Sequence, residues 1–269
     1  MTVITLLTDF GLSDGYPGVM KGVIWKIAPE VQIADISHSI KPQNILHGAL
    51  ALARTSPFFP PGTIHVAVVD PGVGTQRRPI GLRLGEHYFI GPDNGIFTLV
   101  LEEADARQAF VQVVHLDQSK YWQPEISQVF HGRDIFAPVA AHLARGIRLD
   151  ELGTPIQDPI RLQIPRPSPI DGGGWRGQVI EIDTFGNLST NIERSHLLSL
   201  GEVFVQIAGQ RIDGLLNTFG DRPKGTLIAL YGTAHDLMIS IVNGDAAHTL
   251  KVSVGDVVNV YPLVKDRMI

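Results

Sequence analysis

Short apolar runs alternate with helix-like stretches through the first half of the chain, and this alternation limits the possible folds more than any other feature. The runs at 3–7, 31–36 and 63–69 are almost entirely apolar, and helical patterns at 16–27 and 44–54 separate them. Strands without a polar face are buried on both sides, which is typical of a parallel sheet covered by helices. We therefore expect an α/β domain with a mostly parallel sheet over residues 1–160.

The pattern changes near residue 161. Proline is frequent at 161–174, and three consecutive glycines end this stretch. Beyond it, short strands with turn residues between them are expected at 178–182, 203–207, 227–231, 237–242 and 257–260. We therefore expect a linker at 161–174 and a small all-β barrel or sandwich domain at 175–269.

Composition excludes several classes of protein. The chain has 22 Lys and Arg against 27 Asp and Glu, and its net charge of -5 offers no attraction to nucleic acid or to an anionic membrane. The absence of cysteine excludes disulfides, thiolate metal sites and cysteine nucleophiles. No apolar stretch approaches the ~18 residues of a membrane span, and the N-terminus lacks the basic region of a signal peptide. A cytoplasmic protein is the expectation.

Acidic residues stand where the apolar strands end. Asp9 follows the first strand and Asp70 follows the third, while Asp35 lies in the last residues of the second. Ligands of open parallel sheets bind beyond the carboxyl ends of the strands, so these carboxylates could form a polar site. Each has a structural alternative, because Asp before Gly or Pro often caps a turn.

The segment after the third strand carries the most information. Asp70 is followed by a stiff, glycine-rich loop and then by Arg77 and Arg78. Such a loop can bring an arginine back over the carboxylate, which would orient it and lower its pKa. The segment lacks the lysine of a phosphate-binding loop. His131, between a phenylalanine and the start of a helix, is a plausible acid, base or orienting group.

Turns of the second domain contain aromatic and amide side chains. Asp183, Phe185 and Asn187 share one turn, and Phe219, Tyr231 and Gly244 occur in or beside others. Such residues suit the binding of a flat polar ring such as a nucleobase. The structural alternative is an Asx-type turn with a phenylalanine in the core.

A metal site is a further alternative. Six side chains are candidate ligands: Asp9, Asp14, Asp35, His38, Asp70 and His131. No known metal-binding spacing joins them, and no GxSxG sequence indicates a serine hydrolase. We therefore expect no metal.

Taken together, these segments resemble the S-adenosyl-L-methionine (SAM) hydroxide adenosyltransferase family, which is related to the fluorinase and the chlorinase. The resemblance covers nearly the whole chain and is most specific in VDPGVG at 69–74, FHGRD at 130–134 and DTFGN at 183–187. It implies hydrolysis of SAM to adenosine and methionine, with a characteristic Asp-Arg-His trio on Asp70, Arg77 and His131. In the halogenating relatives the position of Asp70 is aromatic and the position of Gly132 is a serine. The aspartate and the glycine of this chain therefore favour water over halide as the nucleophile.

The resemblance also implies the substrate-binding residues. It places Asp9 on the ribose hydroxyls, Asp183, Phe185 and Asn187 beside the methionine part, and Phe219, Tyr231 and Gly244 near the adenine. Gln43 and His235 replace an aromatic and an arginine of the family. The family implies a homotrimer with ligand at subunit interfaces and no cofactor, SAM being the substrate. A nucleoside- or SAM-binding protein without turnover, and a metal-dependent hydrolase, are the alternative functions.

Overall fold

The computed structural model describes residues 2–263. The chain divides into two compact units, Met1–Leu162 and Gln163–Ile269, and the division falls within the proline-rich stretch. None of the helices in the described part of the chain has the length and apolar character that crossing a membrane requires.

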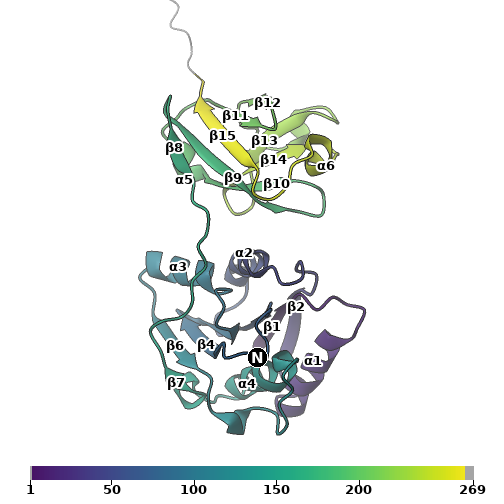
Figure 1. Ribbon diagram of the computed structural model, residues 1–269, viewed down its shortest axis with the longest axis vertical. Coiled ribbons are helices and arrows are strands. Elements are labelled where there is room, and N and C mark those ends of the chain that lie inside the picture. Colours follow the sequence, from purple (N-terminus) through teal and green to yellow (C-terminus); the bar gives the residue numbers. More distant parts are fainter. Residues whose placement is uncertain (1, 264–269) are drawn as a thin grey trace, which may run out of the picture. The chain divides into compact units, whose positions relative to one another are not determined.

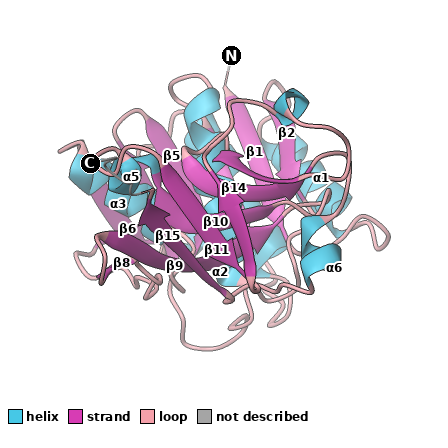
Figure 2. Ribbon diagram, turned by 90° about the horizontal axis from the view of Figure 1, so that it is seen from above, coloured by secondary structure: helices cyan, strands magenta, loops and turns pink. Residues whose placement is uncertain are grey.

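The first unit is built on a seven-stranded mixed sheet (Figures 1 and 2). The strands lie in the order β2 (Gln32–Ser37), β1 (Val3–Thr8), β3 (Ile64–Val68), β5 (His87–Pro92), β4 (Pro79–Leu84), β6 (Val111–His115) and β7 (Thr154–Pro155). Strands β2, β1, β3 and β5 are parallel.

The prediction of a mostly parallel sheet holds only for these four strands. Strand β4 is antiparallel to both β5 and β6, and β6 is antiparallel to β7. The cause lies in the connection, because only Gly85 and Glu86 separate β4 from β5. Two residues can form a hairpin turn but not the crossover that parallel neighbours need.

Helices cover both faces of this sheet. Helices α1 (Tyr16–Ile27) and α4 (Ala137–Ala144) share one apolar core with Leu6 of β1, whereas α2 (Ile45–Thr55) and α3 (Thr98–Ala106) share the other with Leu7. Successive residues of a strand point to opposite faces, so one apolar strand contributes to both cores. The single turns of this unit are η1 (Ser56–Phe58), η2 (Ser119–Tyr121), the π-helical turn η3 (Gly132–Phe136) and η4 (Leu149–Glu151).

One histidine lies entirely inside the first unit. His65 of β3 has no exposed surface, and its Nδ1 is 2.8 Å from Oγ1 of Thr5 on β1. Burial, with a smaller contribution from neighbouring His87, lowers the pKa of His65 from 6.5 to about 3. The folded chain therefore keeps this ring neutral.

We expect His65 to make folding sensitive to acid. Between about pH 6.5 and pH 3 the unfolded chain binds a proton at this ring that the folded chain does not. The free energy of unfolding should therefore fall with decreasing pH, by up to about 1.4 kcal/mol per pH unit from this group. Urea unfolding at several pH values between 7 and 4 measures the free energy of unfolding as a function of pH. That free energy should change less steeply with pH for His65→Leu than for the unchanged protein. Equal slopes would contradict the assignment.

The second unit is an antiparallel, barrel-like sheet. Its strands lie in the order β12 (Gln210–Asp213), β11 (Val203–Ile207), β15 (Val257–Pro262), β9 (Gly174–Ile182), β10 (Leu188–Glu193), β14 (Asp236–Ile241) and β13 (Leu227–Tyr231), and β8 (Ser168–Ile170) pairs with β9. A bridge between Leu216 and Leu230 brings the chain after β12 beside β13, so the sheet nearly closes. Short helices α5 (Arg194–Leu197) and α6 (Ala246–Leu250) and the turn η5 (Phe219–Asp221) complete the unit.

Candidate active site

Three loops of the first unit meet at one edge of its sheet. Thr8 pairs with Val68 on the parallel strands β1 and β3, so Asp9 and Asp70 leave the sheet on the same side. The segment before η3 joins them through aromatic packing, since the rings of Phe10 and Phe130 are 5.7 Å apart. This packing places His131 at the same edge.

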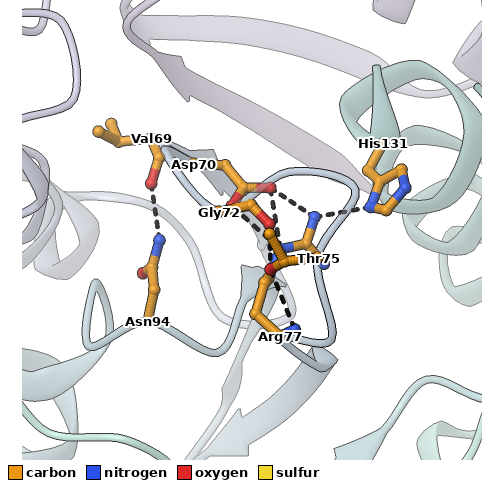
Figure 3. A network of polar contacts seen from close by, with 7 residues as sticks. All are labelled: Val69, Asp70, Gly72, Thr75, Arg77, Asn94 and His131. Atoms are coloured by element: carbon orange, nitrogen blue, oxygen red, sulfur yellow. Dashed lines mark hydrogen bonds and ion pairs between the residues drawn. The ribbon is translucent and has the colours of Figure 1, made fainter. Parts of the chain in front are cut away.

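Asp70 and Arg77 form a buried ion pair (Figure 3). Nε of Arg77 donates to both carboxylate oxygens of Asp70 at 3.0 Å, and Nη2 donates to Oδ2. The side chain of Arg77 is only 8% exposed and that of Asp70 only 4%. The guanidinium also lies 5.3 Å from the ring centre of Phe136. A charge-assisted contact of this kind fixes the orientation of the carboxylate.

His131 extends this pair into a network of three side chains. Its Nδ1 is 2.7 Å from Nη2 of Arg77, while the other ring nitrogen points away from the arginine (Figure 3). A guanidinium can only donate, so Nδ1 is the acceptor and the neutral ring carries its hydrogen on Nε2. Burial and then the charge of Arg77 lower the pKa of His131, although Asp70 and Asp134 act against this. The ring is therefore neutral at neutral pH.

The backbone of the loop after β3 explains how Arg77 reaches its partners. The loop turns twice, through hydrogen bonds from Val73 N to the oxygen of Asp70 at 3.2 Å and from Thr75 N to the oxygen of Gly72 at 3.1 Å. Nδ2 of Asn94 donates to the oxygen of Val69 at 2.8 Å and holds the end of the strand (Figure 3).

Gly74 is the position in this loop that tolerates no side chain. Its φ is +75°, and a Cβ there would overlap the carbonyl oxygen of Gln128. The loop therefore lies directly against the segment that leads to His131, at a distance that only glycine permits.

We expect Gly74→Ala to damage activity and stability together. The overlap with Gln128 forces the loop away from the His131 segment, so the contact between Arg77 and His131 should open. Strain at such a backbone position costs about 1–3 kcal/mol. Gly62→Ala is the matched control, because φ is +83° there but a Cβ meets nothing within 4 Å. Turnover and urea unfolding of the two variants test this; a Gly74→Ala protein as active as Gly62→Ala would contradict it.

Arg78, the neighbour of Arg77, has other partners. Its Nε donates to Oδ2 of the buried Asp93 at 2.8 Å, and Nη1 donates to Oδ1 of Asp158 at 2.9 Å. Asp93 in turn accepts from the backbone N–H of Ile160 at 2.7 Å. Arg78 thus joins the end of the first unit to the turn after β5, and of the two arginines it is Arg77 that faces Asp70.

Asp9 has one occupied and one open carboxylate oxygen. Oδ2 accepts a hydrogen bond from the backbone N–H of Gln43 at 2.8 Å. Gln43 reaches this position in a left-handed conformation, with φ of 63°. Oδ1 accepts no hydrogen bond from any of residues 2–263, so this oxygen is available to a ligand.

Two loops of the second unit also come together. The carboxylate of Asp183 accepts from the backbone N–H groups of Phe185 and Asn187, both at 2.9 Å, and from Nδ2 of Asn187 at 2.8 Å. The Asx-type turn is therefore real, but the alternative of a core phenylalanine is wrong, because Phe185 is 75% exposed. The oxygen of Gly186 accepts from the N–H of Ala247 at 3.0 Å, which brings this turn beside Gly244.

Tyr231 lies apart from these loops. It pairs with Leu237 at the start of β14, whereas Gly244 follows the end of that strand at Ile241. Four strand residues, or about 13 Å, separate the two levels. The guanidinium of Arg194 lies 5.4 Å from the ring centre of Tyr231. Phe219 begins the turn η5 and is 40% exposed.

The candidate metal ligands do not gather into one site. Among residues 2–263, no group of three or more His, Asp or Glu side chains could hold a metal ion. His131 instead contacts Arg77, and Nε2 of His38 lies 3.0 Å from Oδ1 of Asp35. The metal-dependent alternative thus has no ligand cluster in the described chain.

Sequence reasoning missed several residues that build this edge. They are Thr8, Gly74, Asn94 and Phe136, and His38, a candidate metal ligand in the sequence, contacts Thr8 instead. Only Gly74 gave a local signal, as the second glycine of a tight loop. The others act through contacts between residues distant in the chain.

Comparisons with known proteins agree over both units. Residues 4–153 match the SAM hydroxide adenosyltransferase N-terminal domain, and residues 177–259 match the corresponding C-terminal domain. The chain is 36% identical over 261 residues to an (R)-S-adenosyl-L-methionine hydrolase of Thermus thermophilus, covering 95% of this chain and 98% of the relative. It is 31% identical to a fluorinase of Actinoplanes sp., covering 89% and 87%.

A solved structure has the same fold. The crystal structure of an uncharacterized conserved protein from Thermotoga maritima gives a TM-score of 0.88 at 36% identity, covering 96% of this chain and 99% of that one. With matches to both family domains and relatives above 30% identity along most of its length, the chain belongs to the SAM hydroxide adenosyltransferase family.

Proposed function

We propose that this protein hydrolyses SAM to adenosine and L-methionine, with water or hydroxide attacking C5′ of the ribose. The observation that carries the proposal is the buried network of Asp70, Arg77 and His131 at the carboxyl edge of the first sheet. Four relatives that are 35–37% identical to this chain are named (R)-S-adenosyl-L-methionine hydrolase, which supports the same reaction here.

The reaction makes few chemical demands on the protein. The sulfonium of SAM is already cationic and leaves C5′ as the neutral thioether of methionine. The leaving group therefore needs no general acid, and the proposal includes no metal and no cofactor. What the protein supplies is a nucleophile held in line behind C5′, which is a problem of positioning.

The hydrogen bonds of the network divide the work among its members. Nδ1 of His131 accepts from Arg77, so its Nε2–H can only donate to the attacking oxygen. Oδ1 of Asp70 accepts one hydrogen bond from Arg77 and keeps a lone pair for the proton of water. Asp70 is accordingly the proton acceptor in this proposal, while Arg77 orients it and stabilises hydroxide-like charge.

The substrate would be held by both kinds of unit. Asp9, with an open Oδ1, would accept from the ribose hydroxyls. The second unit would supply six residues to the methionine and adenine parts: Asp183, Phe185, Asn187, Phe219, Tyr231 and Gly244. We propose a homotrimer in which the second unit of one subunit completes the site of another. Sedimentation at micromolar concentration should then give three times the 29.3 kDa chain mass.

The function is tested by incubating the full chain with SAM and separating the products. Equimolar adenosine and methionine, formed at the same rate with and without a chelator, is the expected result. A binding protein without turnover would return SAM unchanged, and a metal-dependent hydrolase would stop when the chelator is added.

A further inference from the structure

Four side chains lie end to end beneath the Asp9 loop. Nζ of Lys21 on α1 is 2.6 Å from Oδ2 of Asp35 on β2, and Oδ1 of Asp35 is 3.0 Å from Nε2 of His38. Nδ1 of His38 is 2.8 Å from Oγ1 of Thr8, the last residue of β1. Thr8 and His38 are 0% and 3% exposed, so this series of four side chains runs from the surface to the base of the Asp9 loop.

The direction of these contacts follows from the carboxylate. Burial raises the pKa of Asp35, but the bonds from Lys21 and His38 outweigh it and lower that pKa. The ionised carboxylate of Asp35 lies 3.0 Å from Nε2 of His38 and favours a hydrogen on that nitrogen, so that in the neutral ring Nδ1 accepts from the hydroxyl of Thr8. Oγ1 of Thr8 in turn accepts from the backbone N–H of Phe10 at 3.2 Å.

The series of side-chain contacts ends at the two residues that flank Asp9. Thr8 precedes Asp9, and Phe10 follows it. The same segment after β2 makes two more bonds to this loop: the oxygen of His38 accepts from Gly11 N, and Gln43 N donates to Asp9, both at 2.8 Å. The backbone on both sides of Asp9 is thus fixed by one buried histidine and its neighbours.

A second threonine–histidine pair on the same strand shows what is particular to the first. Thr5 and His65 are both fully buried and have the same 2.8 Å contact between Oγ1 and Nδ1. Neither Nε2 of His65 nor Nε2 of His38 has a hydrogen bond of good geometry among residues 2–263, but Nε2 of His38 lies 3.0 Å from the carboxylate of Asp35 and Nε2 of His65 has no such neighbour. The Thr8 pair differs from the Thr5 pair in having a carboxylate 3.0 Å from its histidine and a loop backbone that bonds to its threonine.

We propose that Thr8 and His38, supported by Asp35 and Lys21, are positioning residues that hold Asp9 in the orientation that binds the ribose hydroxyls. This inference rests on the proposed function, because it takes the role of Asp9 from there. It assigns to the four residues no contact with substrate. Their loss should therefore weaken the binding of ligands that carry ribose hydroxyls and leave the binding of ligands that lack them unchanged.

The test compares two ligands of the full chain by calorimetry, adenosine and 2′,3′-dideoxyadenosine. Thr8→Val keeps the shape of the side chain and removes its hydroxyl. It should raise the Kd of adenosine about tenfold and change the Kd of dideoxyadenosine less than about twofold. Thr8→Ser should restore the preference. Thr5→Val, the matched control, should lower stability without changing the ratio of the two Kd values, since a loss of folded protein affects both ligands equally.

A second variant and a double variant complete the experiment. Asp35 is partly exposed, so Asp35→Asn should disturb folding less than a change at the buried Thr8. It should reduce the same preference for adenosine over dideoxyadenosine. Thr8→Val combined with Asp9→Asn should lose no more than Asp9→Asn alone, because both act on one contact. If Asp9→Asn abolishes the preference while Thr8→Val and Asp35→Asn keep it, the inference fails and the proposed function stands. If Asp9→Asn keeps the preference, the proposed role of Asp9 fails, and this inference fails with it.

Discussion

Replacing Asp70 by asparagine is expected to lower kcat for adenosine formation about 10³-fold, within the range that a positioned proton acceptor contributes. Asparagine has the same shape, but its amide cannot take the proton of the attacking water. It also places a neutral group against the guanidinium of Arg77, where two Nε bonds of 3.0 Å now meet a carboxylate. KM for SAM should change little, because Asp70 acts on the nucleophile.

Two controls belong to that measurement. The affinity for adenosine and the thermal midpoint of Asp70→Asn show whether the fold and the ligand site survive. A kcat within about twofold of the unchanged chain would remove Asp70 from the mechanism. A large fall in adenosine affinity would move its role from the nucleophile to substrate binding.

The second large effect is expected from Arg77→Lys. An ammonium group cannot contact Asp70 through two nitrogens and reach Nδ1 of His131 at the same time, as the guanidinium does. We expect kcat to fall about 10²-fold, the scale of losing one preorganised donor. Steady-state kinetics of the purified variant, at saturating SAM, give this value directly.

Arg78→Lys is the matched control for Arg77→Lys. The adjacent arginine bonds to Asp93 and Asp158, so its replacement should leave kcat unchanged and lower the free energy of unfolding by about 1 kcal/mol. If Arg78→Lys were the inactive variant and Arg77→Lys the active one, the assignment of the trio would be reversed.

The sequence predicted the elements of the first unit well and their pairing less well. The apolar runs and helical periods place β1, α1, β2 and β3 within a residue or two of their observed bounds. Direction is set by connections, however, and the tight turn at Gly85 and Glu86 makes β4 antiparallel within a pattern that otherwise predicts crossovers. In the second unit, β12 was missed because its four residues are mostly exposed and give no apolar run.

The candidate site shows the same division between local and distant causes. Asp70, Arg77 and His131 stand in unusual local sequences, and the structure brings the three together. Thr8 and His38 are thirty residues apart, and no sequence pattern joins them. Only the parallel pairing of β1 with β2 makes them neighbours. Asp183 shows the reverse case, since its carboxylate is used within its own turn, as the structural alternative predicts.

Direct attack of water on C5′ is tested by hydrolysis of SAM in ¹⁸O-labelled water. Adenosine carrying the label at its 5′-oxygen, together with unlabelled methionine, is the expected result. Adenosine formed without the label, or SAM consumed without adenosine, would contradict it.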